Sequence, residues 1–458
     1  MIAESESKKT ERELVVSDKL IGVGSHGTMV FEGTFQSRPV AVKRVLSHFT
    51  TLATQEINLL QSSDHHPNII RYFYQETSDP WLFIALELCP ASLEDLFTKH
   101  REVKELRDKL IPKDALRDIF GGVRHLHGLK IIHRDIKPPN ILVSLTAKGL
   151  KMLISDFGLA KQTTLDQSSF GGTVLSSSIT HLAPTGTTGW RAPEVLLHRG
   201  TESESSGDAS SWDDWDVVRT GKGAATSAGL KQISKRLTSA VDVFSLGCLT
   251  YWLLTRGGHP FGERMERDRN ICKGRSQLNG LPLSEEECSE ARDLVSKMIS
   301  QDSSNRPSVD EAFLHPYFWS PARKLSFLQD ASDRFEIFVR DPPDPMLQLL
   351  ENGSTKVIGS PRDWMRLMDQ SFVDSLGKYR KYDVGSLRDL LRALRNKRHH
   401  YLDLPAAARE AMSPLPEGFL AYFTKRFPLL FLHVYGVISS TELRDEGGFR
   451  EYFLDGER

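Results

Sequence analysis

The segment from Tyr382 to Pro405 carries the most informative pattern of apolar and polar positions in the chain. At helical spacing its leucines fall on one face: Leu387, Leu390, Leu391 and Leu394. Polar side chains gather on the opposite face: Arg388, Arg392, Arg395, Asn396, His399 and His400. Cations, an amide and imidazoles are the groups that hold a phosphodiester and move protons around it. The pattern predicts an amphipathic helix whose polar face can handle phosphate.

The rest of the chain shows strand patterns first and helical patterns afterwards. Strand-type patterns run from Leu14 to about Leu88, with a helix around Thr51 to Ser62. Helical periodicity dominates from about Ser92 to Trp319, and again from Ser320 to Arg458. We therefore expect an α+β protein, with a bilobal domain over residues 14–319 and a mostly α-helical domain after it.

Two polar segments fall outside these patterns. Residues 1–13 are charged and are predicted to be disordered. The segment 201–235 is rich in Ser, Asp and Gly and interrupts the first domain. A polar stretch of this length inside a domain is usually a disordered insertion.

Composition narrows the class of protein. A chain of 458 residues can hold two or three domains with hydrophobic cores. Apolar content of 39% and charged content of 26% suit a soluble globular protein. The net charge is −1, so any affinity for nucleic acid must come from local patches.

Cysteines and apolar runs indicate the compartment. The cysteines show no paired or metal-type spacing, which favours a reducing compartment: Cys89, Cys248, Cys272 and Cys288. The polar N-terminus shows no signal peptide, and the apolar run from Phe427 to Ile438 is too short to span a bilayer. We expect a soluble chain, which could be the cytosolic part of a longer membrane protein.

Residues 22–30 match G-x-G-x-x-G-x-V, the pattern of a glycine-rich loop over nucleotide phosphates. Lys43 ends the buried strand predicted at 40–43, and Glu56 lies on the helix that follows. A lysine that grips α- and β-phosphates needs a carboxylate such as Glu56 to hold it extended. The nucleotide-binding residues expected in this region are Ile21, Gly22, Gly24, Ser25, Gly27, Val30, Ala41, Lys43 and Glu56.

Further motifs follow in order: His133-Arg134-Asp135, Lys137, Asn140, Asp156-Phe157-Gly158 and Ala192-Pro193-Glu194. Their order and spacing match the protein-kinase signature set. Asp135 is expected to orient a substrate hydroxyl and accept its proton, and Lys137 to neutralise the transferred phosphoryl group. Asn140 and Asp156 are expected to hold Mg²⁺ between the phosphates of ATP.

Other positions extend the resemblance to protein kinases. Glu87-Leu88-Cys89 fits the hinge, where the backbone of Glu87 and Cys89 would bind adenine. The resemblance implies an ion pair between Glu194 and Arg306, and it implies that Asp242 braces the catalytic loop.

An active Ser/Thr kinase is favoured over a pseudokinase, because the lysine, the catalytic Asp and the metal-binding Asp are all present. The segment 137–140 lacks a tyrosine-kinase signature. Autophosphorylation is expected between Gly158 and Ala192, where phosphates could pair with Arg134. The first candidate acceptors are Ser168 and Ser169, and further candidates are Thr173 and Ser176 to Ser178.

The segment Tyr382 to Pro405, placed after these motifs, closely resembles the kinase-extension nuclease domain. Two families carry that domain: the inositol-requiring sensor kinase/endoribonucleases of the unfolded protein response, and the oligoadenylate-dependent ribonucleases of animal antiviral defence. Intact Lys43, Asp135 and Asp156 resemble the first family, because the second has a degenerate kinase unit. The absence of ankyrin-type repeats agrees.

The resemblance implies metal-independent RNA cleavage, in which the 2′-hydroxyl attacks the neighbouring phosphate and leaves a 2′,3′-cyclic phosphate. On matching positions, His400 would be the general acid for the leaving 5′-oxygen, and Tyr382 the base or hydroxyl orienter. Arg395 and Asn396 would hold and stabilise the phosphate. The residue types suit this chemistry, since histidine titrates near neutrality and a guanidinium makes bidentate phosphate contacts.

The resemblance also implies a homodimer or higher oligomer that binds ATP or ADP, trans-autophosphorylates and cuts stem-loop mRNA for splicing or decay. The full-length protein would be tethered to the endoplasmic reticulum membrane, with this segment on its cytosolic face. Two alternatives are a signalling kinase whose extension only binds partners, and a nucleotide-gated ribonuclease whose kinase fold is a scaffold. Phosphate transfer without cleavage would select the first alternative, and cleavage without transfer the second.

Overall fold

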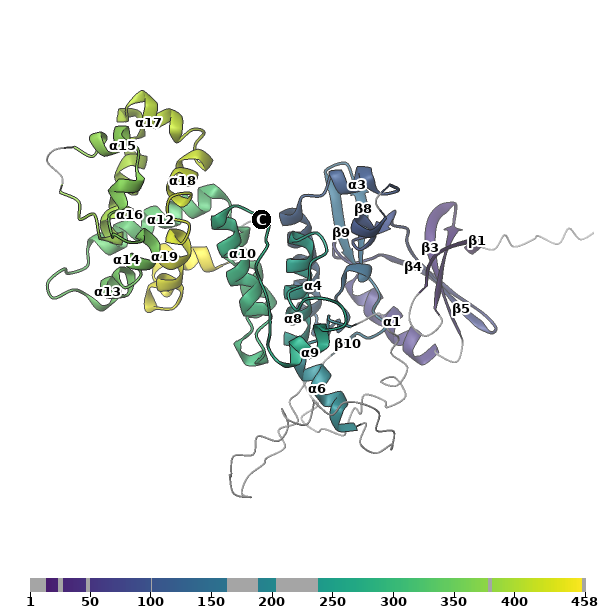
Figure 1. The fold of residues 1–458 in the computed structure, drawn as a ribbon. Coiled ribbons are helices and arrows are strands. Elements are labelled where there is room, and N and C mark those ends of the chain that lie inside the picture. The colour runs from purple at the N-terminus through teal and green to yellow at the C-terminus, as the bar shows by residue number, and fades with distance from the viewer. Residues whose placement is uncertain are drawn as a thin grey trace, which may run out of the picture. The chain divides into compact units, whose positions relative to one another are not determined.

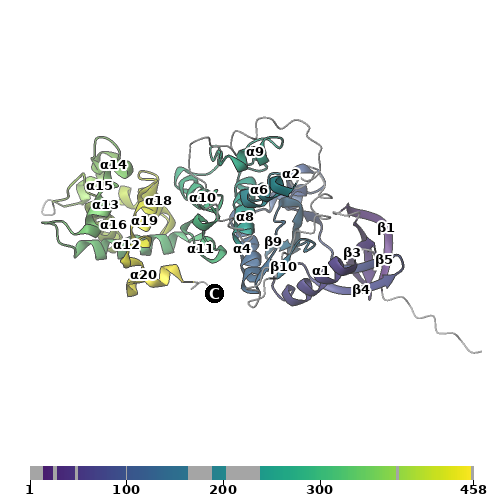
Figure 2. The same ribbon diagram turned by 90° about the horizontal axis from the view of Figure 1, so that it is seen from below.

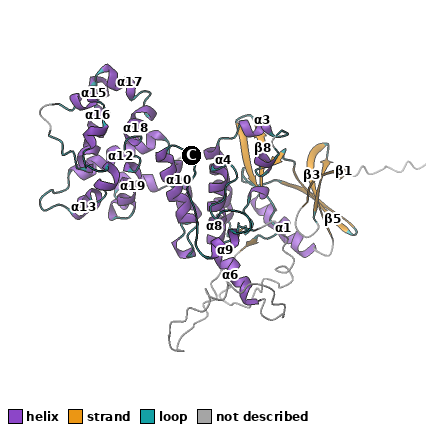
Figure 3. Ribbon diagram, viewed as in Figure 1, coloured by secondary structure: helices purple, strands orange, loops and turns teal. Residues whose placement is uncertain are grey.

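The computed structural model describes residues 14–23, 28–46, 50–99, 101–162, 188–202, 238–377 and 381–454. The chain divides into two compact units, residues 1–278 with 297–309 and residues 279–296 with 310–458. Among the described residues, all strands belong to the first unit and the second is helical (Figure 3). The predicted α+β class is confirmed.

The first unit begins with an antiparallel sheet, five-stranded in the described residues, in the order β1-β2-β3-β5-β4 (Figure 1). Its strands are β1 (Leu14–Val23), β2 (Met29–Phe35), β3 (Arg38–Leu46), β4 (Tyr72–Ser78) and β5 (Trp81–Glu87). Helix α1 (Thr50–Ser63) packs against β3 and β4. Ala53 and Ile57 of α1 join a buried cluster with Val45, Leu82 and Ile84. The strand-rich region and its helix are therefore where the sequence predicted them.

Helices form much of the remainder of this unit. α4 (Pro112–Gly128) and α8 (Ala240–Leu254) pack on each other, and α8 is buried from Val241 to its end. A helix that is apolar on every side belongs inside a core. Further helices are α2 (Asp95–Thr98), α3 (Lys104–Asp108), α6 (Pro193–Glu202) and α9 (Arg267–Cys272), with 3-10 turns at η3 (Pro138–Asn140) and η5 (Ser303–Asn305). The expected insertion at 201–235 begins within α6, and its residues from 203 onward lie outside the described part.

Short strands interrupt this helical region. In the described residues, β6 (Ala91–Ser92), β8 (Ile141–Thr146) and β9 (Gly149–Ile154) form a sheet, and β7 (Ile131–Ile132) pairs with β10 (Lys161–Gln162). The sequence predicted that helical periodicity dominates from about Ser92 and did not single out these strands, because short apolar runs do not distinguish a strand from a helix by periodicity alone. The β8–β9 hairpin pairs Ile141 with Ile154, which brings the residues just before β8 beside those just after β9.

The second unit is built of helices, as predicted. They are α10 (Glu285–Met298), α11 (Val309–Phe313), α12 (Pro321–Glu336), α13 (Pro345–Glu351), α14 (Ser354–Ile358), α15 (Gln370–Ser375), α16 (Leu387–His399), α17 (Ala406–Ala411), α18 (Glu417–Thr424), α19 (Leu430–Ser439) and α20 (Gly447–Arg450). The last two residues of α10 and the first residue of α11 are assigned to the first unit. The 3-10 turns are η6 (Pro316–Phe318), η7 (Trp364–Leu367), η8 (Tyr401–Asp403), η9 (Glu442–Asp445) and η10 (Glu451–Phe453). α12 contacts α16, α18 and α19, and Figure 2 shows these helices together.

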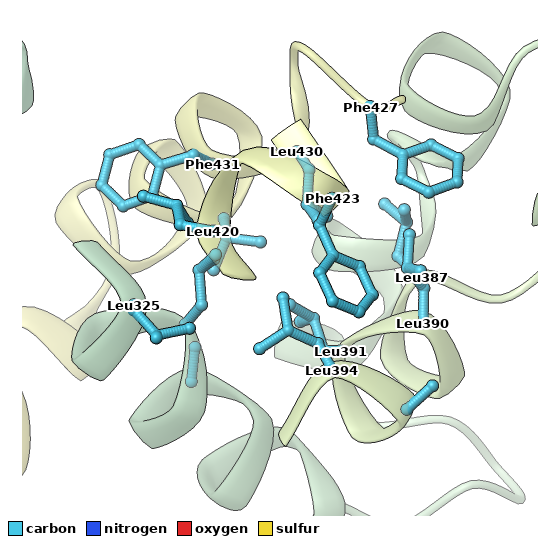
Figure 4. Packing of buried hydrophobic residues seen from close by; sticks show 14 of the residues in the cluster. Leu325, Leu387, Leu390, Leu391, Leu394, Leu420, Phe423, Phe427, Leu430 and Phe431 are labelled. Atoms are coloured by element: carbon cyan, nitrogen blue, oxygen red, sulfur yellow. The ribbon is translucent and has the colours of Figure 1, made fainter. Parts of the chain in front are cut away.

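The core of the second unit contains the leucine face of α16. The four leucines predicted to share that face are fully buried: Leu387, Leu390, Leu391 and Leu394. They pack in one cluster with Leu325, Leu420, Phe423, Phe427, Leu430 and Phe431 (Figure 4). The apolar run from Phe427 to Ile438 is thus core sequence. Among the described residues, no helix has the length and apolar character needed to cross a membrane.

Candidate active sites

The lysine on β3 lies between carboxylates of the first unit. Lys43 Nζ is 2.5 Å from Glu56 Oε1 on α1 and 3.2 Å from Asp156 Oδ1. Burial alone would lower the pKa of Lys43, but these carboxylates outweigh it and raise that pKa above its ordinary value. The predicted pairing of Lys43 with Glu56 is present, and strand pairing places Val30 beside Lys43.

The catalytic-loop residues meet at Asp135. Its Oδ2 accepts a hydrogen bond from Asn140 Nδ2 at 2.9 Å and lies 2.7 Å from Lys137 Nζ. Its Oδ1 is buried and has no hydrogen-bond partner among the described residues. A buried acceptor left open in this way can take the proton of a substrate hydroxyl.

Asp242 on α8 braces this loop, as expected. Its Oδ2 accepts from His133 N at 2.8 Å and lies 2.9 Å from His127 Nε2, while its Oδ1 accepts from Arg134 N at 2.7 Å. Burial opposes the charge of Asp242, but the bonds from His127 and His133 outweigh it and hold the pKa below its ordinary range. These bonds support Arg134 at a φ of 69°, a left-handed conformation that side-chain-bearing residues rarely adopt.

Asn140 and Asp156 lie beside each other across the β8–β9 hairpin, because Ser155 N donates to Asn140 O at 2.9 Å. Lys43 holds the pKa of Asp156 below its ordinary range, so this residue is a carboxylate at neutral pH. Asn140 Nδ2 is engaged with Asp135, which leaves the amide oxygen as the free end. Carboxylate and amide oxygens are ligands that Mg²⁺ prefers, so these residues fit a magnesium site.

Glu194 and Arg306 form the ion pair implied by the kinase resemblance. Arg306 Nη1 and Nη2 each donate to a different oxygen of Glu194 at 2.8 Å. Arg306 Nη1 also donates to the carbonyl of Ala240 at 2.9 Å. The pair therefore ties the start of α6 to the start of α8.

Other positions predicted to bind nucleotide lie on the strands of the sheet and in the segment after β5. Ala41 is buried on β3, Ile21 and Gly22 lie on β1, and Glu87 ends β5 opposite Val40. Burial raises the pKa of Cys89, next to the hinge, to about 12. The predicted nucleotide-binding residues Gly24, Ser25 and Gly27 lie outside the described residues. So do the predicted phosphorylation sites Ser168, Ser169 and Thr173.

The second set of predicted residues meets on and beside α16. Tyr382 precedes the helix, and its hydroxyl accepts a hydrogen bond from Asn396 Nδ2 at 3.2 Å. Arg395 Nη2 donates to Asn396 Oδ1 at 3.3 Å. Asn396 thus links Tyr382 to Arg395, and Arg395 also forms an ion pair with Asp333 on α12.

His400 follows the last residue of α16, one turn beyond Asn396, whose carbonyl accepts from His400 N at 3.0 Å. Its side chain is 63% exposed, and its Nδ1 lies 3.2 Å from Asp403 Oδ2. When Nδ1–H donates to that carboxylate, Nε2 is left to exchange a proton with a ligand. The structure therefore gathers all four predicted residues at the C-terminal half of α16 and the segment before it.

The polar face of α16 is not uniformly exposed. Arg388 is only 5% exposed, and its Nη2 donates to Glu336 O at 3.1 Å and lies 3.2 Å from Glu336 Oε1. The expectation that Arg388 belongs to the phosphate-handling face is wrong, because α12 covers that part of the helix. His399 and His400 are exposed, as expected.

Sequence reasoning missed the residues that fix α16 in place. Glu351 on α13 accepts hydrogen bonds from Ser386 Oγ at 2.7 Å and from the first two N–H groups of α16 at 3.1 and 3.0 Å. Asp389 Oδ2 accepts from Asp383 N at 2.7 Å. Ser386 and Asp389 have the S-x-x-D spacing of a capping box, which could have revealed Asp389. No local pattern marks Glu351 as a cap of α16, since Ser386 and the start of α16 are distant from it in sequence.

Two family models match the chain in succession. The model described as "Protein kinase domain" matches residues 15–213 and 230–318. The model described as "Ribonuclease 2-5A" matches residues 324–453. The candidate site around Lys43 and Asp135 lies within the protein kinase match, and the candidate site around Tyr382 and α16 lies within the ribonuclease match.

Several curated relatives match nearly the whole of this chain. The "Sensor for unfolded proteins in the ER ire1" of Schizosaccharomyces pombe is 42% identical over 99% of this chain and 40% of its own length. The "Serine/threonine-protein kinase/endoribonuclease ireA" of Aspergillus fumigatus is 42% identical over 96% and 39%, and the "Serine/threonine-protein kinase/endoribonuclease IRE2" of Homo sapiens is 38% identical over 92% and 40%. The chain thus spans about two fifths of the length of these relatives. As the motifs on both halves of the sequence indicated, the chain belongs to the IRE1 family, in which a protein kinase domain is followed by a ribonuclease 2-5A domain.

Proposed function

We propose that this chain is a dual enzyme of the unfolded protein response, a Ser/Thr kinase and an endoribonuclease. The observation that carries the proposal is that one chain holds two assembled sites of different chemistry. One site joins Lys43 to Glu56 and leaves Asp135 Oδ1 open, and the other links Tyr382, Asn396 and Arg395. The names of the relatives cited above favour the same pairing of activities.

The kinase site would transfer the γ-phosphoryl group of ATP to a serine or threonine. Lys43 would hold the α- and β-phosphates, and Lys137 would neutralise the transferred group. Asp135 would accept the hydroxyl proton as the oxygen attacks phosphorus and the bond to the β-phosphate oxygen breaks. Mg²⁺ held by Asn140 and Asp156 would offset the charge of the phosphates. The acceptors would lie on another copy of the chain, first at Ser168, Ser169 and Thr173.

The nuclease site would cut stem-loop RNA without a metal ion. Tyr382 would orient or deprotonate the RNA 2′-hydroxyl, whose oxygen attacks the neighbouring phosphorus. Arg395 and Asn396 would stabilise the charge that builds on the phosphoryl oxygens. His400 would give its proton to the leaving 5′-oxygen, so the products are a 2′,3′-cyclic phosphate and a 5′-hydroxyl. Asp403, at 3.2 Å from His400 Nδ1, would hold the imidazole ring in place for this step.

The setting proposed for the full-length protein follows from its relatives. A sensing region across the endoplasmic reticulum membrane would cluster the chains, and this segment would act on the cytosolic side as a homodimer or higher oligomer. Assembly would then depend strongly on concentration, as mass action requires.

The direct test is incubation of the chain with ATP, Mg²⁺ and a small RNA hairpin, followed by mapping of both products. The proposal expects phosphoserine or phosphothreonine between Gly158 and Ala192, and RNA ends that carry a 2′,3′-cyclic phosphate. Phosphate transfer without cleavage would indicate a signalling kinase with a partner-binding extension. Cleavage without transfer would indicate a ribonuclease with a kinase scaffold.

A further inference from the structure

Arg392 has no role in the cleavage mechanism proposed above, yet its side chain contacts Tyr382 of the proposed nuclease site. Its guanidinium carbon is 4.9 Å from the centroid of the Tyr382 ring, and its Nη1 is 3.3 Å from Asp389 Oδ1. The side chain of Arg392 is 17% exposed and that of Asp389 is 6% exposed. A guanidinium over an aromatic face is attracted by the ring, and more strongly where water is scarce. Arg392 therefore connects the ring of Tyr382 to a buried carboxylate.

Tyr382 is held by groups that each restrain a different part of it. The edge contact with Trp364, at 6.1 Å between ring centroids and 84° between planes, limits how far the ring can shift. Trp364 is itself fully buried, and its Nε1 donates to Asp383 O at 3.1 Å. Asn396 holds the hydroxyl. A single hydrogen bond to one atom does not fix the plane of a ring, and the guanidinium over the face supplies that restraint.

Asp389 extends the arrangement to the main chain. Its Oδ2 accepts from the backbone N–H of Asp383, the residue after Tyr382, at 2.7 Å. Asp389, Arg392 and Asn396 are spaced i, i+3 and i+7 on α16, so they lie on one stripe of the helix. This stripe holds in turn the backbone beside Tyr382, its ring and its hydroxyl.

We infer that Arg392 is a positioning residue of the nuclease site, which fixes the Tyr382 ring so that its hydroxyl stays on Asn396 and faces the RNA 2′-hydroxyl. The inference deepens the proposed function and rests on it, because Arg392 acts through Tyr382. The alternative role for Arg392 is direct binding of an RNA phosphate by its guanidinium. Low exposure and two partners within the domain leave little of the Arg392 guanidinium for a phosphate, so positioning is the better account.

The first measurement determines kcat and KM separately for hairpin cleavage, at a protein concentration high enough for the chain to be fully assembled. Arg392→Gln is expected to lower kcat about 10-fold or more, with KM within about two-fold, because a misplaced reacting group slows chemistry without weakening binding. Arg392→Lys should recover part of kcat, since an ammonium keeps the attraction to the ring. Arg366→Gln is the matched control: it removes an arginine of the same domain that is 70% exposed and pairs with Asp363.

The deciding measurement is a double-mutant cycle with Tyr382→Phe. If Arg392 acts through Tyr382, Arg392→Gln should cost much less in the Tyr382→Phe background than in the natural chain. An equal loss in both backgrounds, or a raised KM with kcat unchanged, would overturn the inference in favour of direct RNA binding. If Tyr382→Phe were impaired but Arg392→Gln cut normally, the inference would fail while the proposed nuclease stood. If Tyr382→Phe itself cut at the natural rate, the proposed role of Tyr382 would fail, and the inference about Arg392 would fail with it.

Folding is checked by thermal unfolding and by autophosphorylation of each variant. Should Arg392→Gln lose its folded nuclease domain, the same cycle is run with Arg392→Lys, which keeps the charge beside Asp389. There, a kcat loss that shrinks in the Tyr382→Phe background supports positioning, and a loss that persists unchanged rejects it.

Discussion

Two aspartates of the kinase unit, Asp135 and Asp242, differ in how many of their carboxylate oxygens have hydrogen-bond partners. Asp135 has one oxygen engaged by Lys137 and Asn140 and a second oxygen without a partner among the described residues. Asp242 has both oxygens engaged by His127, His133 and Arg134. An open oxygen suits proton transfer, whereas a saturated carboxylate can only support structure.

Asp242→Asn should destabilise the kinase unit and abolish phosphate transfer, because it leaves buried donors partly unpaired. Breaking a buried charged network typically costs about 3–5 kcal/mol. The native pKa of Asp242 lies below its unfolded value, so its charge stabilises the fold above the unfolded pKa, and that stability is lost as pH falls through the native pKa. Unfolding free energies measured between about pH 6 and pH 3 should therefore fall less steeply for Asp242→Asn than for the natural chain. Equal slopes would contradict this role.

In the nuclease unit, Arg395→Ala should slow RNA cleavage by about 10²–10³-fold, since it removes the cation proposed to stabilise the reacting phosphate. Arg395→Lys should recover little, because the link to Asn396 depends on the forked guanidinium. Cleavage rates at saturating hairpin measure this, with autophosphorylation as the internal control. A rate for Arg395→Ala within a factor of about two of the natural chain would remove Arg395 from the site.

At the scale of elements, α16 shows which features local sequence can determine. The leucine face was predictable because its period and the apolar character of its residues suffice to place it in a core. The burial of Arg388 was not predictable, since it depends on α12 lying over that part of the helix. The same holds for Glu351 and Asp333, whose partners on α16 are distant in sequence.

In the kinase unit, the order and spacing of motifs predicted the site residues. The strands β8 and β9 were not predicted, because they lie within a region where helical periodicity dominates. The pairing of Lys43 with Glu56 and of Glu194 with Arg306 could be predicted, since each follows from a shared family pattern. The catalytic, nucleotide-binding and phosphorylation roles of all these residues remain predictions, and Gly24, Ser25, Gly27, Ser168, Ser169 and Thr173 also lie outside the described residues.

Glu351→Gln should loosen the start of α16, because it weakens a charged cap that accepts from Ser386 and from the first backbone N–H groups of the helix. Hydrogen bonds to a charged group are worth about 1.5–3 kcal/mol, so a loss of about 1–2 kcal/mol in nuclease-domain stability is expected. Thermal or denaturant unfolding measures it, and Glu410→Gln, an exposed position in the same domain, is the control. Unfolding midpoints that match for the two variants would show that the cap adds nothing.

At the scale of the whole molecule, the kinase and nuclease sites lie in different family matches on one chain, so one can regulate the other only through a conformational equilibrium. A nucleotide that favours the state with Lys43 held by Glu56 would shift that equilibrium. We propose that nucleotide occupancy, rather than phosphate transfer, is what the nuclease senses.

ADP should therefore increase hairpin cleavage by unphosphorylated Asp135→Asn protein at high concentration, and a ligand that displaces the α1 helix should suppress it. Asp135→Asn should block phosphate transfer without disturbing the ion pair between Lys43 and Glu56. Cleavage and sedimentation with and without ADP provide the readout. No gain with ADP would favour a switch that depends on phosphorylation alone.

The proposal of two separate active sites on one chain can be tested by measuring phosphate transfer and RNA cleavage in both Asp135→Asn and His400→Ala. Each substitution should remove one activity and leave the other. Asp135→Asn should lose autophosphorylation yet cut RNA when ADP is bound, and His400→Ala should autophosphorylate normally while cleavage falls by about 10²–10⁴-fold. EDTA should stop phosphate transfer and spare cleavage by the assembled protein. Hairpin cleavage by His400→Ala at the natural rate would contradict the account, because the helix identified here would then not be the nuclease site.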